Sequence, residues 1–256
     1  MIQIRKQIAL IEELAANAWP AETVQTLDGW RMRYTGGRSR RINSVWPNLE
    51  LGDIPLEEKL DLVEDFYRRK AQIPRYQMCP AAQPTDLVEI LEQRGYTADA
   101  HTQVQISTLG FVLPRVETEL SDQVEITNQL PDDWLDFYAK VENYTAERKT
   151  IRRGVLTRIG PLTGFASLHK DGEIVAIGLG VVERGWLGLF CMLTHPDHRR
   201  QGAATTVLQA LGKWGQEVEA THTYLQVMEN NPTALALYAR AGYKHLYQYY
   251  YLEKRE

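Results

Sequence analysis

The stretch "HPDHRRQGAATTVLQALGKWG" (residues 195–215) joins a basic, glycine-containing loop to an apolar-periodic helix. A helix N-terminus exposes unpaired N–H groups and the positive end of the helix dipole. Gly202, Ala203 and Ala204 let a ligand approach this backbone closely, and Arg199 and Arg200 add positive charge. The loop therefore has the ingredients of a diphosphate cradle. Small residues also allow a helix to pack closely on a strand, so the pattern has a structural explanation as well.

The loop matches neither of two common phosphate-binding motifs. A P-loop requires a lysine followed by serine or threonine after its second glycine, and the Rossmann motif requires three spaced glycines. Residues 195–215 contain neither arrangement. The loop alone therefore does not identify a nucleotide-binding fold.

The flanking residues alternate between strand and helix patterns. Asp171-Gly172 marks a hairpin turn, while Asn231, Pro232 and Gly242 suit the N-cap, first and post-terminal positions of a helix. The periodicity predicts helices at 132–141, 146–159, 203–218 and 232–242, and strands at 163–170, 173–183, 186–194, 223–229 and 245–252. This order indicates an α/β fold.

The first half repeats the same order with different residues. Helices are predicted at 56–70 and 85–95, and strands at 41–47, 75–80 and 98–106, after an N-terminal helix. Placing Gly95-Tyr96 on Gly242-Tyr243 without gaps superimposes two helix starts and two helix ends. We therefore expect two copies of one fold, residues 1–115 and 116–256, joined near 109–118 where a glycine and a proline break the pattern.

A second motif follows the loop. Its members form the array N-x-x-A-x-x-L-Y-x-x-x-G-Y: Asn231, Ala234, Leu237, Tyr238, Gly242 and Tyr243. Together with Arg199-x-x-Gly202-x-Ala204, the array resembles the GNAT superfamily of acetyl-CoA-dependent N-acetyltransferases over about residues 124–252. The paired halves, with "GWRMR…RINSVWP" in the first, resemble a tandem-GNAT subfamily.

The resemblance implies an α/β protein of two GNAT-like domains, each a mixed central sheet flanked by helices. The first copy would be degenerate, and the second would transfer an acetyl group directly from acetyl-CoA to a primary amine, without a metal. Tyr238 would be catalytic, near the thioester sulfur. The cofactor-binding residues would be Met192, Leu193 and Thr194 for the pantetheine arm, Arg199, Arg200, Gln201, Gly202, Ala203 and Ala204 for the pyrophosphate, and Asn231 and Tyr238 near the arm. Asn231 can equally be a plain N-cap, and Tyr238 a core aromatic.

The chemistry of acyl transfer fits a tyrosine. With a reference pKa of about 10 against about 8.5 for a thiol, tyrosine stays protonated at neutral pH and can donate to the departing thiolate. A backbone N–H near Leu193 could serve the oxyanion. Many family members carry a glutamate on the strand before the loop, but residues 186–194 contain none. The base is therefore open between solvent and four residues acting through water: Glu142, Glu183, Glu229 and His195. Cys191 is expected to be a core residue.

The first copy departs from the cofactor pattern. Leu91 falls where Tyr238 stands, Asp53 places a negative charge at the phosphate position, and Pro55 removes an N–H. We expect this copy to wall an acceptor cleft without binding acetyl-CoA. Its five arginines within residues 31–41 form either a solvated hairpin around Gly36-Gly37 or an anion-attracting rim beside that cleft. A first-half strand near 100–107 is expected to complete the second sheet.

Composition limits the remaining possibilities. The 256 residues are 44% apolar and 24% charged, which is typical of a soluble globular protein. Glu12 and Glu13 interrupt the N-terminal apolar stretch, so a cytoplasmic location without a membrane partner is expected. The net charge of −4 argues against nucleic-acid binding, and two distant cysteines argue against a disulfide framework or a zinc site.

Two other functions stay open at this stage. One is a non-catalytic acyl-CoA-binding or sensing module, and the other is a nucleotide-binding regulatory domain that uses the loop for another diphosphate. The acceptor is equally open between a metabolite amine, a protein lysine or N-terminus, and an antibiotic amine. The sequence does not indicate the oligomeric state.

Overall fold

The computed structural model describes residues 2–37, 39–119 and 123–254. In chain order the elements are α1 (Ile2–Asn17), β1 (Thr23–Leu27), β2 (Trp30–Tyr34), η1 (Arg40–Ile42), β3 (Val45–Trp46), α2 (Leu56–Arg68), β4 (Arg75–Met78), α3 (Leu87–Gln93), β5 (Thr97–Thr108), α4 (Leu109–Val112), η2 (Leu113–Arg115), β6 (Val124–Thr127), α5 (Asp132–Val141), α6 (Ala146–Thr157), β7 (Leu162–Lys170), β8 (Glu173–Glu183), β9 (Trp186–Thr194), η4 (Pro196–His198), α7 (Ala203–Glu217), β10 (His222–Met228), α8 (Pro232–Arg240) and β11 (Lys244–Glu253). The predicted helices and strands of the second half are confirmed to within two residues.

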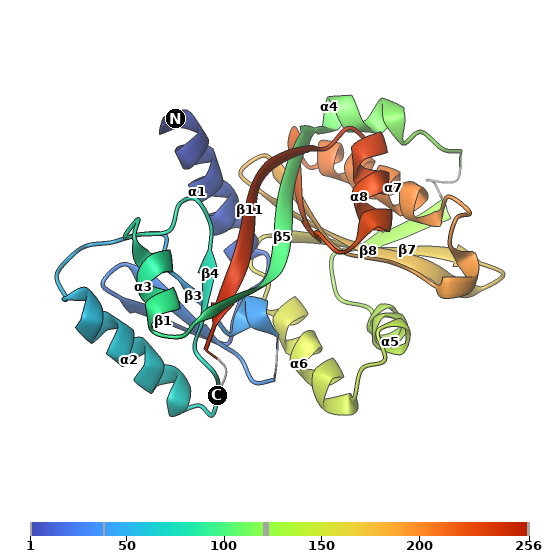
Figure 1. Ribbon diagram of the computed structural model, residues 1–256. Helices are drawn as coiled ribbons and strands as arrows, with labels where there is room; N and C mark the ends of the chain where they lie inside the picture. The colour runs from blue at the N-terminus through green and yellow to red at the C-terminus, as the bar shows by residue number, and fades with distance from the viewer. Residues whose placement is uncertain (1, 38, 120–122, 255–256) are drawn as a thin grey trace.

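The described strands form one mixed sheet of eleven strands in the order β1-β2-β3-β4-β11-β5-β10-β9-β8-β7-β6. The sheet runs from the first half, at the left of Figure 1, to the second half at the right. Strands β3 and β4 pair in parallel, as do β9 and β10, and the other described pairs are antiparallel. The predicted α/β class is confirmed, with the two halves sharing a single sheet.

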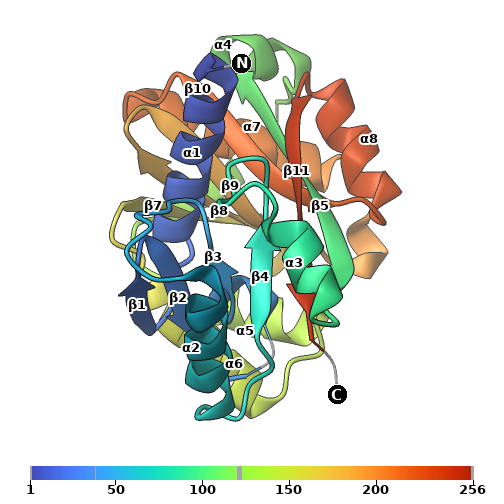
Figure 2. The ribbon, with the colours of Figure 1, turned by 60° about the vertical axis from the view of Figure 1, so that its left-hand side comes forward.

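The two halves exchange their last strands. Strand β5 of the first half lies between β10 and β11, and β11 of the second half lies between β5 and β4. Figures 1 and 2 both show β5 and β11 running side by side through the middle of the molecule. The prediction that a first-half strand near residues 100–107 completes the second sheet is confirmed, because Thr102–Thr108 pairs with all of β10.

Helices cover both faces of the sheet over three apolar cores. One core packs α1, α5 and α6 against one face, and a second packs α4, α7 and α8 against the other. Successive side chains of a strand point to opposite faces of the sheet, so neighbouring residues belong to different cores. Phe165 belongs to the first core, and the next residue, Ala166, to the second. The third core lies under α2 and α3 in the first half.

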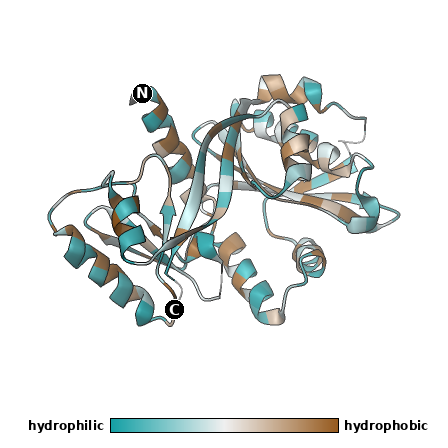
Figure 3. Cartoon of the chain, viewed as in Figure 1, coloured by the Kyte–Doolittle hydropathy of each residue, from teal (hydrophilic) through white to brown (hydrophobic). Residues whose placement is uncertain are grey.

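In the third core, the amphipathic pattern of α2 determines which side of the helix packs against the sheet. Helix α2 buries Leu60, Val63 and Phe66 against the sheet, while the polar residues between them keep its outer side hydrophilic (Figure 3). Among the described residues, no helix has the length and apolar character needed to cross a membrane.

Two glycines in β8 allow α7 to pack closely on the sheet. A Cβ atom at Gly178 would stand 2.8 Å from Val207 Cγ1, and one at Gly180 would stand 2.8 Å from Trp214 Cζ3. Neither contact is tolerable for a real side chain, so these positions require glycine. The close packing fixes α7, and with it the loop that precedes its N-terminus.

Candidate active site

The sheet opens between β9 and β10. The two strands pair only from Trp186–Leu189 to His222–Leu225 and then separate. A β-bulge lies at this point in β9, where the register with β8 shifts between Ile177 and Leu179 and Cys191 takes a φ of +51°. Beyond the bulge β9 still pairs with β8, so its edge facing β10 is left unpaired.

Thr194 presents its backbone groups to this opening. It is paired with Ala176 of β8, and the next N–H, that of His195, donates to the Val175 carbonyl at 2.9 Å. In an antiparallel pair this pattern makes Thr194 a non-hydrogen-bonded position. Its N–H and C=O therefore point away from β8, toward the side where β10 has separated.

The loop before α7 is exposed and locally strained. Arg200 has a φ of +60°, and Gly202, the N-cap residue of α7, has a φ of +87°. A Cβ added at Gly202 would meet no atom within 4 Å. Among the described residues none forms an ion pair with Arg199 or Arg200, and the Arg199 Nε only reaches the Thr194 carbonyl at 3.5 Å. Open backbone and unneutralised positive charge at a helix N-terminus suit a diphosphate.

A cavity of about 330 Å³ lies where the strands separate. It is lined by Trp19, Arg41, Tyr138, Arg152, Leu189, Phe190, Cys191, Met192, Gln226, Val227, Met228, Asn230, Asn231, Ala234 and Tyr238. Of the residues assigned to the cofactor site from the sequence, the cavity brings together Met192, Asn231 and Tyr238. Leu193 and Thr194 continue β9 outside its wall, and the six residues from Arg199 to Ala204 form the adjoining loop and helix start.

Tyr238 is a buried tyrosine on α8 that faces this cavity. Only 7% of the residue is exposed, and its ring meets Tyr243 edge-on with centroids 5.7 Å apart. Burial raises the pKa of Tyr238 to about 12. Its hydroxyl makes no hydrogen bond to a described residue, so it is a protonated donor available to a ligand.

Asn231 caps α8, as the sequence predicted. Its side-chain oxygen accepts the Ala234 N–H at 3.1 Å. Its side-chain nitrogen has no partner among the described residues. The capping role is therefore confirmed, and the role in cofactor binding stays a prediction.

No candidate base lines the cavity. Glu183 accepts both of its hydrogen bonds from Asn17 at 3.1 Å, and Glu229 accepts one from Gln248. Glu142 is exposed beyond α5, although its charge contributes to raising the pKa of Cys191. The fourth, His195, accepts the Asp197 N–H at 3.4 Å. Within the described part of the chain, no group of His, Cys, Asp and Glu could hold a metal ion.

Four residues from outside the β9–α8 part of the chain complete the cavity wall, and the sequence assigned none of them a site role: Trp19, Arg41, Tyr138 and Arg152. Three of them carried no local signal, because they come from α5, α6 and the segment after α1, far apart in the chain. Arg41 did carry one, since it belongs to the basic run 31–41. The run contributes to the cavity from the first half, as the alternative of a rim beside a cleft required.

The expectation of a solvated hairpin in the basic run is wrong. Arg33 is only 2% exposed, and its guanidinium donates to the carbonyls of Arg41, at 2.9 Å, and of Trp19. Arg31, Arg40 and Arg41 are half-buried. Arg33 is drawn inward because backbone carbonyls and the Trp46 ring, 4.4 Å from its Cζ, satisfy it there, whereas Arg40 pairs with the carboxylates of Asp99 and Glu253. Arg38 lies outside the described residues.

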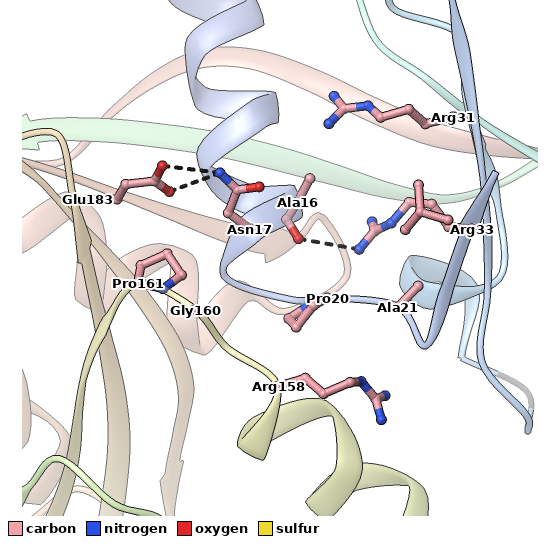
Figure 4. Close-up of a pocket in the computed structure, with 11 residues that line it drawn as sticks. Ala16, Asn17, Pro20, Ala21, Arg31, Arg33, Arg158, Gly160, Pro161 and Glu183 are labelled. Atoms are coloured by element: carbon pink, nitrogen blue, oxygen red, sulfur yellow. Dashed lines mark hydrogen bonds between the residues drawn. The ribbon is translucent and has the colours of Figure 1, made fainter. Parts of the chain in front are cut away.

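A larger cavity of about 600 Å³ is lined by residues of both halves (Figure 4). Arg31, Arg33 and Arg158 line it, but several of its polar groups bond to one another. Figure 4 shows the Asn17 amide on the Glu183 carboxylate, and the Arg33 guanidinium reaching the Ala16 carbonyl at 3.5 Å. None of the motif residues of β9, α7 or α8 lines this cavity, so it is the weaker candidate.

The loop before α2 in the first half is built differently from the loop before α7 in the second. The N–H groups of Gly52 and Asp53 donate to the Asp28 carboxylate at 3.3 and 3.1 Å. Lys59 holds Asp28 in place at 2.5 Å, and this bond lowers the pKa of Asp28 to about 2. The N-cap of α2 is Pro55, which has no N–H. A carboxylate of the chain already occupies donors that would be needed for a phosphate.

The mixed sheet thus opens between two parallel strands, beside a glycine loop at the N-terminus of the helix that joins them. The chain belongs to the family described as "Probable histone acetyltransferase Rv0428c C-terminal", whose model matches residues 5–252. It is 27% identical over 257 residues to "Uncharacterized N-acetyltransferase YobR" of Bacillus subtilis, covering both chains completely.

Solved structures share the fold over nearly the whole chain. A GCN5-related N-acetyltransferase from Kribbella flavida has a TM-score of 0.68 at 15% identity, covering 99% of this chain and 95% of that one. A tandem GNAT protein from the clavulanic acid biosynthesis pathway has a TM-score of 0.65 at 12% identity, with coverages of 96% and 88%. The predicted resemblance and fold class are confirmed, because the chain has the GNAT fold and belongs to an acetyltransferase family.

Proposed function

We propose that the chain transfers an acetyl group from acetyl-CoA to a primary amine. The observation that carries the proposal is the meeting of Met192, Asn231 and the unpartnered Tyr238 hydroxyl around one cavity, at the point where β9 and β10 separate. The division into copies at 1–115 and 116–256 belongs to this proposal. The first copy supplies a wall of the cavity, and the second supplies the cofactor site.

Several features of the site support acetyl-CoA as the donor. The amides of Arg199, Arg200, Gln201, Gly202, Ala203 and Ala204 would hold the pyrophosphate, where a Cβ at Gly202 would meet open space. The unpaired edge at Met192, Leu193 and Thr194 would bind the pantetheine arm by strand-like hydrogen bonds. The free side-chain nitrogen of Asn231 would donate to the same arm.

Acetyl-CoA supplies an acetyl group activated as a thioester. The amine nitrogen bonds to the acetyl carbon while the carbon–sulfur bond breaks, and an unpaired N–H of β9 stabilises the carbonyl oxygen. Tyr238 gives its proton to the departing sulfur. The proton lost by the amine returns to Tyr238 through water, so the products are an N-acetyl amide and CoA thiol.

Solvent takes part in this scheme because no carboxylate or imidazole of a described residue lines the cavity. The Cys191 thiol does not substitute for a base, since burial raises its pKa to about 11. Water entering beside the amine is therefore the proton acceptor. No covalent enzyme intermediate is needed.

The decisive experiment combines binding with turnover. Calorimetric titration with CoA, ATP and NAD should show binding of CoA alone, and a panel of primary amines should include members that release CoA thiol from acetyl-CoA. CoA binding without thiol release from any amine would instead identify an acyl-CoA-binding module. Preferential binding of ATP or NAD would identify a nucleotide-binding regulatory domain.

A further inference from the structure

We propose that the acceptor amine also carries a carboxylate, and that Arg41 and Arg152 bind this carboxylate in the cavity beside Tyr238. The inference rests on the proposed function in one respect: the cavity is taken as the place where the acceptor meets the acetyl group. It adds the chemical class of the acceptor, a small amino acid-like molecule.

The two arginines come from different halves and converge on one aromatic wall. Arg41 belongs to η1 and Arg152 to α6, and both line the cavity. Their Cζ atoms lie 5.5 and 4.6 Å from the centre of the Trp19 ring. Phe190 stacks on the same ring with centroids 5.9 Å apart. The ring thus sits beside both positive charges.

Neither arginine has a counter-charge in the part of the chain that the structure describes. No acidic residue lines the cavity, and among the described residues none forms an ion pair with either guanidinium. Arg41 donates to the Tyr249 hydroxyl at 3.3 Å, and Arg152 donates to the Tyr144 hydroxyl at 2.7 Å. Each guanidinium has five N–H donors, so most remain available. Two half-buried like charges repel each other, and an anion between them relieves that cost.

The charges lie close to the reacting end of the site. Burial raises the pKa of the Cys191 thiol, and the charges of Arg152 and Arg41 both oppose that shift. The positive charges of both guanidiniums therefore influence the thiol at the bulge of β9, which lies beside the place proposed for the thioester. If a carboxylate is held there, an amine separated from it by only a few bonds in the same molecule lies within reach of the acetyl group. Guanidinium forks match the planar geometry of a carboxylate.

The first half holds this wall in place through Arg33. Its guanidinium donates to the backbone carbonyls of both Trp19 and Arg41. Arg33 itself does not line this cavity, so it acts as a positioning residue. The carboxylate site thus depends on residues that a single GNAT-like copy would lack.

The test measures binding independently of turnover. The protein with CoA bound is titrated calorimetrically with amino acids and with their decarboxylated amines, such as phenylalanine against phenethylamine and lysine against cadaverine. At least one amino acid should bind ten times or more tightly than its matched amine. Arg41→Gln and Arg152→Gln should each abolish this preference while changing CoA affinity by less than twofold.

Arg153→Gln provides the matched control. Arg153 neighbours Arg152 on α6 but pairs with Asp132 at 2.7 Å outside the cavity, so its variant should keep the full preference. Arg152→Lys retains the positive charge but lacks the two-pronged guanidinium, so it should lose part of the preference for the amino acid. This variant tests the carboxylate site if Arg152→Gln does not fold.

Two failures are distinguishable. Equal binding of amino acids and matched amines, or a preference that survives both glutamine variants, would overturn the carboxylate site even if amines release CoA. A carboxylate preference that depends on Arg41 and Arg152 would support the site even if no acceptor releases CoA, and only the proposed function would then fail.

Discussion

At the scale of single residues, the proposed mechanism depends on the hydroxyl of Tyr238. Tyr238→Phe keeps the ring and its contact with Tyr243 but removes the proposed proton donor. We expect kcat to fall by roughly 100-fold, the lower end for general acid catalysis, with acetyl-CoA affinity nearly unchanged. Steady-state kinetics with chemistry shown to be rate-limiting would measure this. Unchanged turnover would remove Tyr238 from the mechanism.

Tyr243→Phe is the matched control. The Tyr243 hydroxyl is buried and bonds to Thr223 at 3.0 Å, away from the cavity wall. Its removal should cost about 1 kcal/mol of stability and leave turnover near normal. The pair of variants therefore separates catalysis from packing.

The pH dependence follows from the same tyrosine. Burial raises the pKa of Tyr238 to about 12, so the donor form persists throughout pH 6–10. The amine must be neutral to attack, and no described base lines the cavity. We therefore expect kcat/KM to rise about tenfold per pH unit below the pKa of the amine, with no alkaline decline before pH 10. A bell-shaped profile falling near pH 8 would contradict this assignment.

The sequence was enough to bring predicted site residues together where they belong to neighbouring elements of one motif. Met192, Asn231 and Tyr238 lie on β9 and α8, and the order of these elements is enough to bring them to one cavity. Trp19 and Arg152 could not be found in this way. Their place depends on how α1 and α6 pack across the sheet, and on Arg33 binding the Trp19 carbonyl.

At the scale of elements, the loop before α7 is tested by Gly202→Asp. The change places a negative charge where the pyrophosphate is proposed to lie. We expect CoA affinity to fall at least tenfold, about 1.4 kcal/mol, as measured by calorimetry. The φ of +87° adds a strain of roughly 1–2 kcal/mol, but the open space around Gly202 lets the chain fold.

Gly185→Asp controls for that strain. Gly185 lies in the β8–β9 turn with a φ of +75° and equally open surroundings, at the end of β9 away from the loop. It should show a similar stability loss with unchanged CoA affinity. If Gly202→Asp also leaves affinity unchanged, the loop does not bind the diphosphate.

Most elements were predictable because their periodicity is local. The extent of strand β3 was not predicted correctly. The sequence predicted a strand over residues 41–47, but in the structure the strand covers only Val45–Trp46. The Asn43 side chain accepts the Thr35 N–H at 2.9 Å and donates to the Ser39 carbonyl at 2.9 Å. Such side-chain bonds compete with a strand ladder and replace it with the turn of η1.

At the scale of the whole molecule, the exchange of β5 and β11 makes the two halves dependent on each other. The need for a borrowed strand could be predicted from the order of elements, but its register could not. That register places Val104 opposite both Gln226 and Tyr247. It is fixed by side chains on three strands from both halves, which no local pattern reports.

Separating the halves tests this dependence. In a chain limited to residues 116–256, β10 and β11 would lose β5, their shared partner, and the cavity would lose Trp19 and Arg41. An open edge of this length is an aggregation liability. We expect poorly soluble, inactive protein, judged by the soluble fraction, size-exclusion chromatography and CoA release. Co-expression with residues 1–115 should restore a soluble, active complex, because both exchanged strands regain their partners. A monomeric, fully active second half would show that the exchanged strand and the first-half wall are dispensable.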